Sequence, residues 1–394
     1  MKLTANNPPR RLSVFGSTGS IGVNTLDVID HLGGRDQFEV MAVTGHANIE
    51  LLAEQARATG ARLAVTADES QYMALKDALS GTKTDVAAGK SGLKEAAELD
   101  AEWVMAAIVG TAGLAPTLAA AARGATIALA NKECLVSGGD LFVDAVKAGG
   151  GKLIPVDSEH SAIFQCLDNN QRHALERIIL TASGGPFRAY TREQMRDVTV
   201  QSARTHPNWA MGLKISVGSA SMFNKALEMI EAKHLFGVTS DQIEVVVHPQ
   251  SIIHSMVGYA DGSVLAQLGA PDMRTAIGYA LTYPSRPGLP VERLDFTKLS
   301  RLDFEAPDED RFPALRLARV AMERGGLQGA IMNAAEETAF DAFVTGDIGF
   351  LDMAGIAEKV MEAMVDHPPA SSIDDVYKTD EEARRRASGF IKHI

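Results

Sequence analysis

The chain has few cysteines, few positive charges and no long apolar run. Its two cysteines, Cys134 and Cys166, do not form a CxxC pair and cannot build a disulfide framework, so a disulfide-stabilised secreted domain is excluded and two packed thiols are expected. No stretch approaches the ~20 apolar residues of a membrane-spanning helix, and the first eleven residues contain no apolar signal core. We therefore expect a cytoplasmic protein without a membrane partner.

Positive charge is scarce as well. The sequence contains 38 Lys and Arg residues against 50 Asp and Glu residues, for a net charge of -12. An acidic surface repels nucleic acid, so no nucleic-acid partner is expected. Local basic residues can still bind a small phosphate.

What the sequence does contain is length and apolar periodicity. A chain of 394 residues exceeds what one hydrophobic core usually serves. Short apolar runs alternate with helical patterns up to about residue 153, which predicts βαβ units on a parallel sheet. Further strands, a proline-rich stretch at 283–290 and a mainly helical segment follow. We predict an α/β fold with domains at 1–151 and 152–282, a linker at 283–311 and a helical domain at 312–394.

A glycine-rich turn, Gly16-Ser17-Thr18-Gly19-Ser20-Ile21-Gly22, lies between the predicted strand 12–15 and the predicted helix 21–29. Such glycines allow backbone N–H groups to approach a pyrophosphate, which the helix N-terminus then stabilises. An NAD site usually has an acid at the end of the second strand, but this strand ends Val43-Thr44-Gly45-His46-Ala47. NADP is therefore favoured. His46 either contacts its 2'-phosphate or is simply an exposed or capping histidine.

Three carboxylates form a candidate metal site. Asp157 and Glu159 follow an apolar run, and Glu228 lies in a later helical pattern. Carboxylate oxygens are the donors that Mg2+ or Mn2+ prefers. If the preceding strand continued, the two-residue spacing would point Asp157 and Glu159 to the same side. The alternative is a solvated strand end, and the sequence does not show that Glu228 is near.

Other polar residues suit a phosphorylated substrate. Lys132, between Asn131 and Glu133, follows a predicted strand and could hold a substrate oxygen, or the three residues could simply start a helix. A long segment from Ser183 to Gly212 has the features of a lid, with one helix expected at 191–203. Trp209 in this segment would cover a ligand or pin the loop. In contrast, His248 and His254 are expected to be structural, because no third imidazole or thiol lies at ligand spacing.

With these residues identified, the chain resembles the 1-deoxy-D-xylulose 5-phosphate reductoisomerase family over nearly its whole length. The resemblance is carried by the stretches GSTGSIG (16–22), ANKE (130–133), PVDSEHSAIFQ (155–165), SGGPFR (183–188), HPNWAMG (206–212), NKALE (224–228), HPQSIIHSM (248–256) and DGSVLAQLGAPDMRT (261–275). It implies a Rossmann-like NADPH-binding domain, a central α/β catalytic domain with a flexible lid, and a small C-terminal helical domain.

The resemblance also implies roles for single residues. Asp157, Glu159 and Glu228 would bind Mn2+, Mg2+ or Co2+; Lys132, Ser158, Glu159 and His206 would contact the substrate carbon skeleton, with Trp209 above it; Ser183, Ser219, Asn224 and Lys225 would hold its phosphate; Thr18, Gly19, Ser20, Ile21, Asn48, Asn131, Glu133 and Gly212 would line the NADPH site. The implied reaction rearranges the ketose phosphate by retro-aldol cleavage and re-addition and reduces the aldehyde to 2-C-methyl-D-erythritol 4-phosphate. A homodimer is the family expectation.

The sequence departs from the family pattern at a few positions. Ala47 stands where a basic residue is common, so a relaxed NADPH preference is expected. Gly218 and Ala226 replace a usual Asp and Gly beside the phosphate residues, and Glu336 replaces a usual Asn. Two other functions compete with this interpretation. A metal-independent dehydrogenase would need a nucleophilic thiol or a hydride-relay histidine, and a dinucleotide-sensing regulator would leave the three acids unexplained.

Overall fold

The computed structural model describes residues 8–204 and 212–394. Its contacts divide the chain into two compact units, each made of several segments. Unit 1 contains residues up to 134, 142–161 and 272–292, and unit 2 contains residues 135–141, 162–271 and 293–394. The predicted domain division, with boundaries at 151, 282 and 311, does not coincide with these two units. The units are defined by contacts alone, so the domain division remains a prediction.

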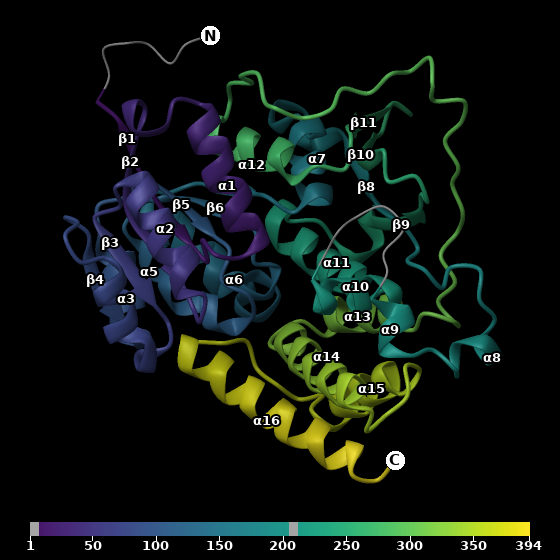
Figure 1. Cartoon of the computed structure of the whole chain (residues 1–394). Coiled ribbons are helices and arrows are strands. Elements are labelled where there is room, and N and C mark those ends of the chain that lie inside the picture. The colour runs from purple at the N-terminus through teal and green to yellow at the C-terminus, as the bar shows by residue number, and fades with distance from the viewer. Residues whose placement is uncertain (1–7, 205–211) are drawn as a thin grey trace. The chain divides into compact units, whose positions relative to one another are not determined.

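Eleven strands are assigned in the described residues (Figure 1). They are β1 Arg10–Phe15, β2 Phe38–Gly45, β3 Leu63–Thr66, β4 Asp85–Ala88, β5 Trp103–Ala106, β6 Thr126–Leu129, β7 Leu153–Pro155, β8 Leu175–Ala182, β9 Ile243–Val247, β10 Ile253–Tyr259 and β11 Val264–Leu268. The α-helices are α1 Ser20–His31, α2 Ile49–Thr59, α3 Tyr72–Ala78, α4 Gly89–Glu98, α5 Leu114–Ala122, α6 Lys132–Gly149, α7 Ser158–Cys166, α8 Arg192–Met195, α9 Val200–Ala203, α10 Leu213–Ala220, α11 Phe223–Phe236, α12 Met273–Thr282, α13 Ala314–Arg324, α14 Gln328–Thr345, α15 Asp352–Ala363 and α16 Ile373–Ile391.

Unit 1 is built on a seven-stranded sheet in the order β4-β3-β2-β1-β5-β6-β7, and every pairing in it is parallel. The predicted βαβ pattern is thus confirmed. Central strands such as β5 are buried along their whole length, as expected for a sheet covered on both faces. Strand order reverses between β1 and β5, and ligands of open α/β sheets bind at such a switch point, beyond the carboxyl ends of the strands.

Two segments of unit 1 lie beyond the predicted boundary at residue 151. β7 pairs with β6 as the last strand of the parallel sheet. α12 packs on α1 and on β6, and the indole N–H of Trp103 in β5 donates a 3.1 Å hydrogen bond to the carbonyl of Ala280 in α12. Burial of Trp103 and this bond join a late helix to the first sheet.

Unit 2 contains a four-stranded mixed sheet in the order β11-β10-β8-β9, with β8 and β9 parallel and the other pairs antiparallel. Its core continues from β8 through the buried helix α11 into α13, α14 and α15. The C-terminal helices, yellow-green to yellow in Figure 1, therefore share one hydrophobic core with the second sheet. Within residues 8–204 and 212–394, no helix has the length and apolarity needed to span a membrane.

The expected single helix at 191–203 is wrong. Two one-turn helices, α8 and α9, occupy this stretch, and each begins with a capping box. The side chain of Thr199 accepts a 3.2 Å hydrogen bond from the N–H of Ser202 while its own backbone is extended. This cap starts a new helix and so interrupts the first one.

Candidate active site

The glycine turn after β1 lies at the switch point of the parallel sheet. Gly16 has φ +81°, and a Cβ there would lie 2.4 Å from the carbonyl oxygen of Ala107, in the loop after β5. A Cβ on Gly22 would lie 2.3 Å from the carbonyl oxygen of Gly16, so only glycine lets α1 start this close to the turn. Gly19 caps α1 without a side-chain hydrogen bond, and the first turn of α1 has no acidic residue. The N-terminus of α1, with Thr18, Ser20 and Ile21 around it, thus suits a pyrophosphate.

The loop after β6 is fixed to the loop after β5. Asn131 is the N-cap of α6: its Oδ1 accepts a 3.0 Å hydrogen bond from the N–H of Cys134, and its Nδ2 donates to the carbonyls of Ile108 and Gly110, the latter at 2.8 Å. Asn48 caps α2 in the same way, accepting from the N–H of Leu51 at 3.2 Å. Both asparagines therefore shape the carboxyl edge where the cofactor residues were expected.

Lys132 and Asp157 meet at this edge. Lys132 is the first residue of α6, after β6, and its Nζ lies 2.6 Å from Oδ2 of Asp157, after β7. Glu133 lies in the first turn of α6, so the helix start considered for this stretch is real. It is compatible with a role for Lys132, because the helix start is what directs this side chain to Asp157.

The strand before Asp157 does not continue, so the assumption that alternation along a strand orients Asp157 and Glu159 is wrong. β7 ends at Pro155 and α7 begins at Ser158. The carbonyl of Asp157 accepts from the N–H of Ser161 at 2.8 Å, and its Oδ1 accepts from the N–H of Glu159 at 3.3 Å. The hydroxyl of Ser158 donates to the carboxylate of Glu159. Asp157 and Glu159 are thus held together by the start of a helix.

The predicted phosphate residues all belong to unit 2. Ser183 follows β8, and its Oγ accepts a 3.2 Å hydrogen bond from the N–H of Gly185. Gly185 has φ +65°, and a Cβ on it would lie 2.9 Å from the carbonyl oxygen of Ser219 in α10. This close approach brings the loop that begins at Ser183 against the end of α10. Gly218 is in van der Waals range of Asn224, with 3.7 Å from an added Cβ to the Cβ of Asn224.

Asn224, Lys225 and Glu228 lie on consecutive turns of α11. Met222, with φ 64°, precedes this helix in the left-handed region. The side chains of Asn224 and Lys225 both donate to the carboxylate of Glu228, which is fully buried. The structure therefore brings Lys132, Asp157, Ser158 and Glu159 together in unit 1 and the phosphate residues with Glu228 in unit 2.

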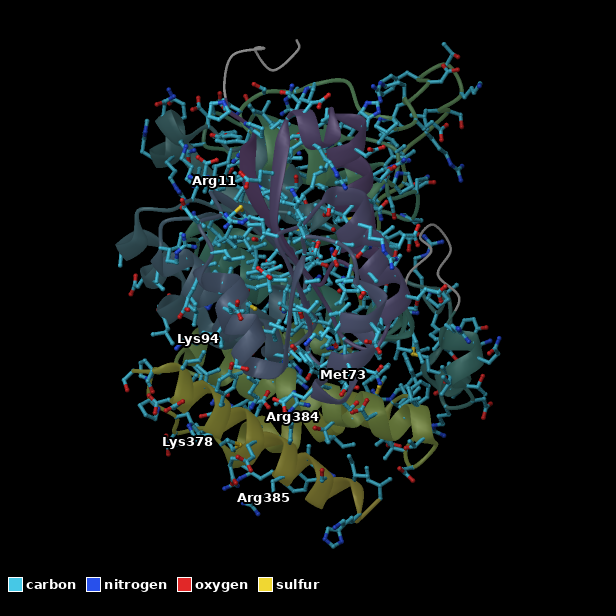
Figure 2. The ribbon with its side chains drawn as sticks, turned by 60° about the vertical axis from the view of Figure 1, so that its left-hand side comes forward. Arg11, Met73, Lys94, Lys378, Arg384 and Arg385 are labelled. Atoms are coloured by element: carbon cyan, nitrogen blue, oxygen red, sulfur yellow. The ribbon has the colours of Figure 1, made fainter. Side chains whose placement is uncertain are left out.

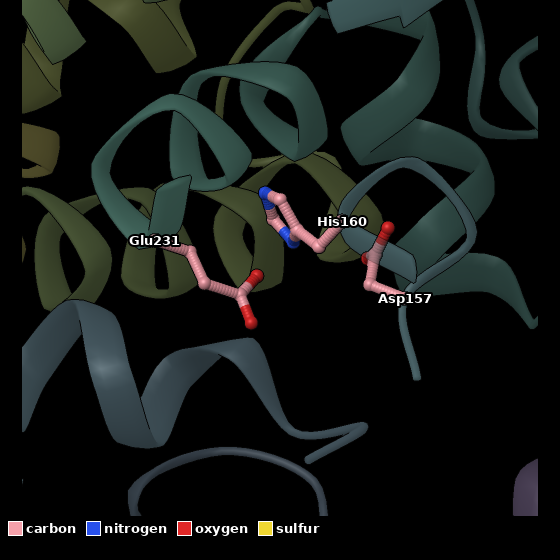
Figure 3. Close-up of side chains that lie close together, drawn as sticks. All are labelled: Asp157, His160 and Glu231. Atoms are coloured by element: carbon pink, nitrogen blue, oxygen red, sulfur yellow. The ribbon is translucent and has the colours of Figure 1, made fainter. Parts of the chain in front are cut away.

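Two buried residues were not assigned a role from the sequence. His160, in the first turn of α7, and Glu231, one turn after Glu228 in α11, have no exposed surface (Figure 3). A carboxylate buried in an apolar helix is expensive unless it is partnered. The spacing of Glu228 and Glu231 in the sequence could have indicated the second acid, whereas nothing in the sequence indicated its burial.

Several other expectations have plain outcomes. His206 and Trp209 fall in 205–211, which lies outside the described residues, and Gly212 is the N-cap of α10. Both cysteines are free thiols, with Cys134 buried and Cys166 half-buried. His248 is structural as expected: Nδ1 donates to the carbonyl of Asp303 at 2.8 Å and Nε2 accepts from the N–H of Ile252 at 3.3 Å.

Comparison with known proteins covers most of the chain. Family models described as 1-deoxy-D-xylulose 5-phosphate reductoisomerase, its C-terminal domain and DXP reductoisomerase C-terminal domain match residues 12–139, 153–236 and 268–386. Curated relatives of that name from Allorhizobium ampelinum and Rhizobium rhizogenes are 73% and 74% identical over 388 residues, 98% of this chain and of each relative.

Solved structures agree. The 1-deoxy-D-xylulose 5-phosphate reductoisomerase of Zymomonas mobilis in complex with NADPH has a TM-score of 0.93 and 51% identity, over 98% of this chain and 100% of that one. A DOX-P reductoisomerase in complex with NADPH, fosmidomycin and magnesium has a TM-score of 0.91 and 40% identity, over 97% and 98%.

The glycine turn at the switch point of a parallel sheet, in a chain with these relatives, defines a dinucleotide-dependent oxidoreductase. Within that class, the chain belongs to the 1-deoxy-D-xylulose 5-phosphate reductoisomerase family.

Proposed function

We infer that the chain catalyses the NADPH- and divalent-metal-dependent rearrangement and reduction of 1-deoxy-D-xylulose 5-phosphate to 2-C-methyl-D-erythritol 4-phosphate, a step of isoprenoid biosynthesis. The observation that carries this inference is the pairing of Lys132 with Asp157 at the carboxyl edge of a sheet whose switch point has a dinucleotide turn. Relatives with 73% and 74% identity bear this enzyme's name.

We propose that Asp157, Glu159 and Glu228 together bind one Mg2+ or Mn2+, with Co2+ as a further candidate. Their donor atoms are carboxylate oxygens, which suit hard dications. Within each unit a lysine already balances one carboxylate: Lys132 pairs with Asp157, and Lys225 pairs with Glu228. Metal binding requires the deprotonated carboxylates, and the cation would compete with these lysines for them.

When bound, NADPH supplies the hydride and the cation polarises the ketone and neighbouring hydroxyl oxygens of the substrate. Lys132 would donate a hydrogen bond to the oxygen on which negative charge develops. The hydroxyl of Ser158 donates a hydrogen bond to Glu159, so its Oγ can accept a hydrogen bond from a substrate hydroxyl. His206 would contact the carbon skeleton, and Trp209 would exclude water above it.

The substrate phosphate would be held in unit 2. Ser183, Ser219 and Asn224 supply hydrogen-bond donors and Lys225 supplies charge, all from one loop and two adjoining helices. The N-terminus of α11, where Asn224 and Lys225 lie, adds the favourable end of a 14-residue helix. The NADPH site would be lined by Thr18 to Ile21, Asn48, Asn131, Glu133 and Gly212.

We also propose that the enzyme is a cytoplasmic homodimer. β11 lies at an edge of the second sheet, and its Val264 and Leu265 are 47% and 49% exposed. An exposed edge strand offers unpaired backbone groups to another chain, and exposed apolar residues on it mark a candidate interface. Light scattering should show a dimer for the natural chain and a monomer for Leu265→Lys.

The experiment that tests the function follows NADPH absorbance with the ketose phosphate. Oxidation should stop when EDTA removes the metal and return with Mn2+ or Mg2+. A metal-independent dehydrogenase would be indifferent to EDTA, and a sensing protein would bind NADPH without consuming it.

A further inference from the structure

A cavity of about 440 Å³ lies within unit 2, between α8 and the start of α15. Three cationic side chains line it: Arg192 in α8, Arg196 at the C-cap of α8, and Lys359 in α15. Asp352 is the acidic side chain of the lining, and its Oδ2 accepts a 2.8 Å hydrogen bond from the N–H of Gly349. The lining therefore holds three cationic side chains against one acidic side chain, in a chain whose net charge is -12.

The cations of this lining form few ion pairs, although Glu193 in α8 interacts electrostatically with Arg192 and Arg196. Within the part of the chain that the structure describes, Arg196 and Lys359 take part in no salt bridge, and Arg192 donates at 3.2 Å to the backbone carbonyl of Asp310. The opening of α15 at Asp352 adds the positive end of a 12-residue helix. Three cations and a helix start that face one cavity favour an anion.

The floor of the cavity is apolar. Phe350 and Ile356 line it and are 4% and 1% exposed. Gly355 also lines it, and a Cβ on this residue would meet no atom within 4 Å, so space remains above the floor. A volume in the range of ligand pockets, with charge at the rim and apolar groups below, suits an amphiphilic ligand. Arginine forks bind the oxygens of phosphates and carboxylates in pairs, and three cations favour the phosphate because a phosphate monoester carries a charge of about -1.5 to -2 at pH 7.

We propose that this cavity, the α8–α15 site, binds a small organic phosphate. Arg192, Arg196 and Lys359 hold its phosphate, and its short apolar part lies on Phe350 and Ile356. The site is separate from the catalytic residues, because none of its lining residues belongs to the proposed metal, substrate or cofactor sets.

The site also regulates the enzyme, and this second part rests on the proposed function. The ring of Phe350 packs edge-on against Phe187, with centroids 5.4 Å apart. Phe187 is 2% exposed and lies in the loop that begins at Ser183, where the substrate phosphate is proposed to bind. A ligand on Phe350 therefore contacts a residue that packs against Phe187 of the phosphate loop. It changes substrate affinity to the extent that it binds the substrate-bound and the substrate-free enzyme with different affinity.

Hydrogen exchange read by peptide locates binding without any use of turnover. n-Pentyl phosphate added to the metal-free full chain should slow exchange in residues 192–196 and 349–359 in a saturable manner. Inorganic phosphate should do so with weaker affinity, because it lacks the apolar part, and n-pentanol should have no effect. No protection of these residues at any concentration would overturn the proposal.

Charge-removing variants test the assignment of the phosphate contacts. Arg196→Gln/Lys359→Gln should raise the n-pentyl phosphate concentration at half-maximal protection at least tenfold. The matched control, Lys378→Gln/Arg385→Gln, removes one lysine and one arginine from α16 (Figure 2) and should leave it unchanged. An equal change in both variants would mean nonspecific charge attraction and would overturn the site.

The apolar floor has its own test. Gly355→Leu fills the space above Phe350, so n-pentyl phosphate should then bind no better than inorganic phosphate. Unchanged discrimination between the two probes would contradict a ligand tail on this floor.

Regulation is tested by steady-state kinetics. n-Pentyl phosphate should change the KM for the ketose phosphate in the natural chain, and the part of this change that acts through the α8–α15 site should disappear in Arg196→Gln/Lys359→Gln. An identical change in both proteins would place the effect at the catalytic site and overturn regulation. Absence of turnover would contradict the proposed function, but it would not affect the binding that hydrogen exchange measures.

Discussion

Lys132 holds its ammonium nitrogen 2.6 Å from a carboxylate oxygen of Asp157, and only 13% and 12% of the two side chains are exposed. A proposed substrate contact and a proposed metal ligand are thus one ion pair. Lysine and cation compete for the same carboxylate, so each must weaken the other's hold on Asp157.

Replacement of Lys132 should therefore separate metal binding from turnover. Lys132→Met should tighten Mn2+ binding by up to about tenfold, because a competing positive charge is removed, and should lower kcat about 100-fold, because a donor to the developing charge is lost. Calorimetry and steady-state rates measure the two effects. Lys147→Met, which removes an exposed lysine at the other end of α6, is the control. Weaker Mn2+ binding in Lys132→Met would contradict the competition.

The choice of the third metal ligand is tested by two acids of the same helix. Glu228→Gln should weaken Mn2+ binding at least about tenfold, since one carboxylate of a hard-cation site is neutralised. Glu231→Gln, one buried turn later, should change it little. NADPH affinity should stay constant in both, because the glycine turn belongs to the other unit. The reverse order of effects would make Glu231 the ligand.

Glu337 should stabilise the folded enzyme at neutral pH and lose this effect in acid. Burial alone would raise the pKa of Glu337, but Lys214, 2.5 Å away, and Arg384 more than offset burial, so its pKa lies below the ordinary value (Figure 2 labels Arg384). A carboxylate whose pKa is lower in the folded than in the unfolded state stabilises the fold at pH values above its unfolded-state pKa, about 4.3. This stabilisation is lost as the pH falls through the folded-state pKa.

Glu337→Gln should thus lower the free energy of unfolding by about 1–3 kcal/mol at pH 7, because Lys214 and Arg384 each lose an ion pair and Arg384 keeps its pair with Asp380. The difference in unfolding free energy between the variant and the natural chain should narrow below about pH 4. Urea unfolding at several pH values measures it. Glu382→Gln, which breaks exposed ion pairs on α16, should cost far less. A difference in unfolding free energy that stays constant with pH would show that Glu337 acts by packing alone.

Cofactor choice should respond to Ala47, an exposed residue just after β2. Ala47→Arg should tighten NADPH binding about tenfold and leave NADH binding unchanged, because a guanidinium can pair with the 2'-phosphate that only NADPH carries. Ala47→Gln controls for side-chain size, and nucleotide fluorescence reports both affinities. Equal gains for both nucleotides would place the 2'-phosphate elsewhere.

The sequence predicted those parts of the fold that depend on local pattern. Continuous apolar runs such as Trp103–Ala106 gave the parallel strands, and glycines at 16 and 22 gave the dinucleotide turn, because period and backbone conformation are local properties. It did not place β7 or α12 with the first sheet, since their pairing depends on partners more than twenty residues away.

At the site, the types of functional residue could be predicted from the sequence, but their local backbone structure, burial and ion pairs could not. Oxygen chemistry made Asp157 and Glu159 candidate ligands, yet the strand assumed to orient them ends at Pro155 and a helix begins at Ser158. Burial of Glu231 and the salt bridge of Lys132 depend on packing of distant segments, and neither has a local signature. The α8–α15 site likewise combines residues that lie far apart in the chain.

The measurement that tests the central claim most directly is identification of the product formed from 1-deoxy-D-xylulose 5-phosphate, NADPH and Mn2+. One NADPH should be consumed per molecule of branched 2-C-methyl-D-erythritol 4-phosphate, carbon NMR should show the rearranged skeleton, and EDTA should abolish both. NADPH consumption that yields an unbranched, directly reduced sugar phosphate, or that persists in EDTA, would contradict the account and favour a simple dehydrogenase.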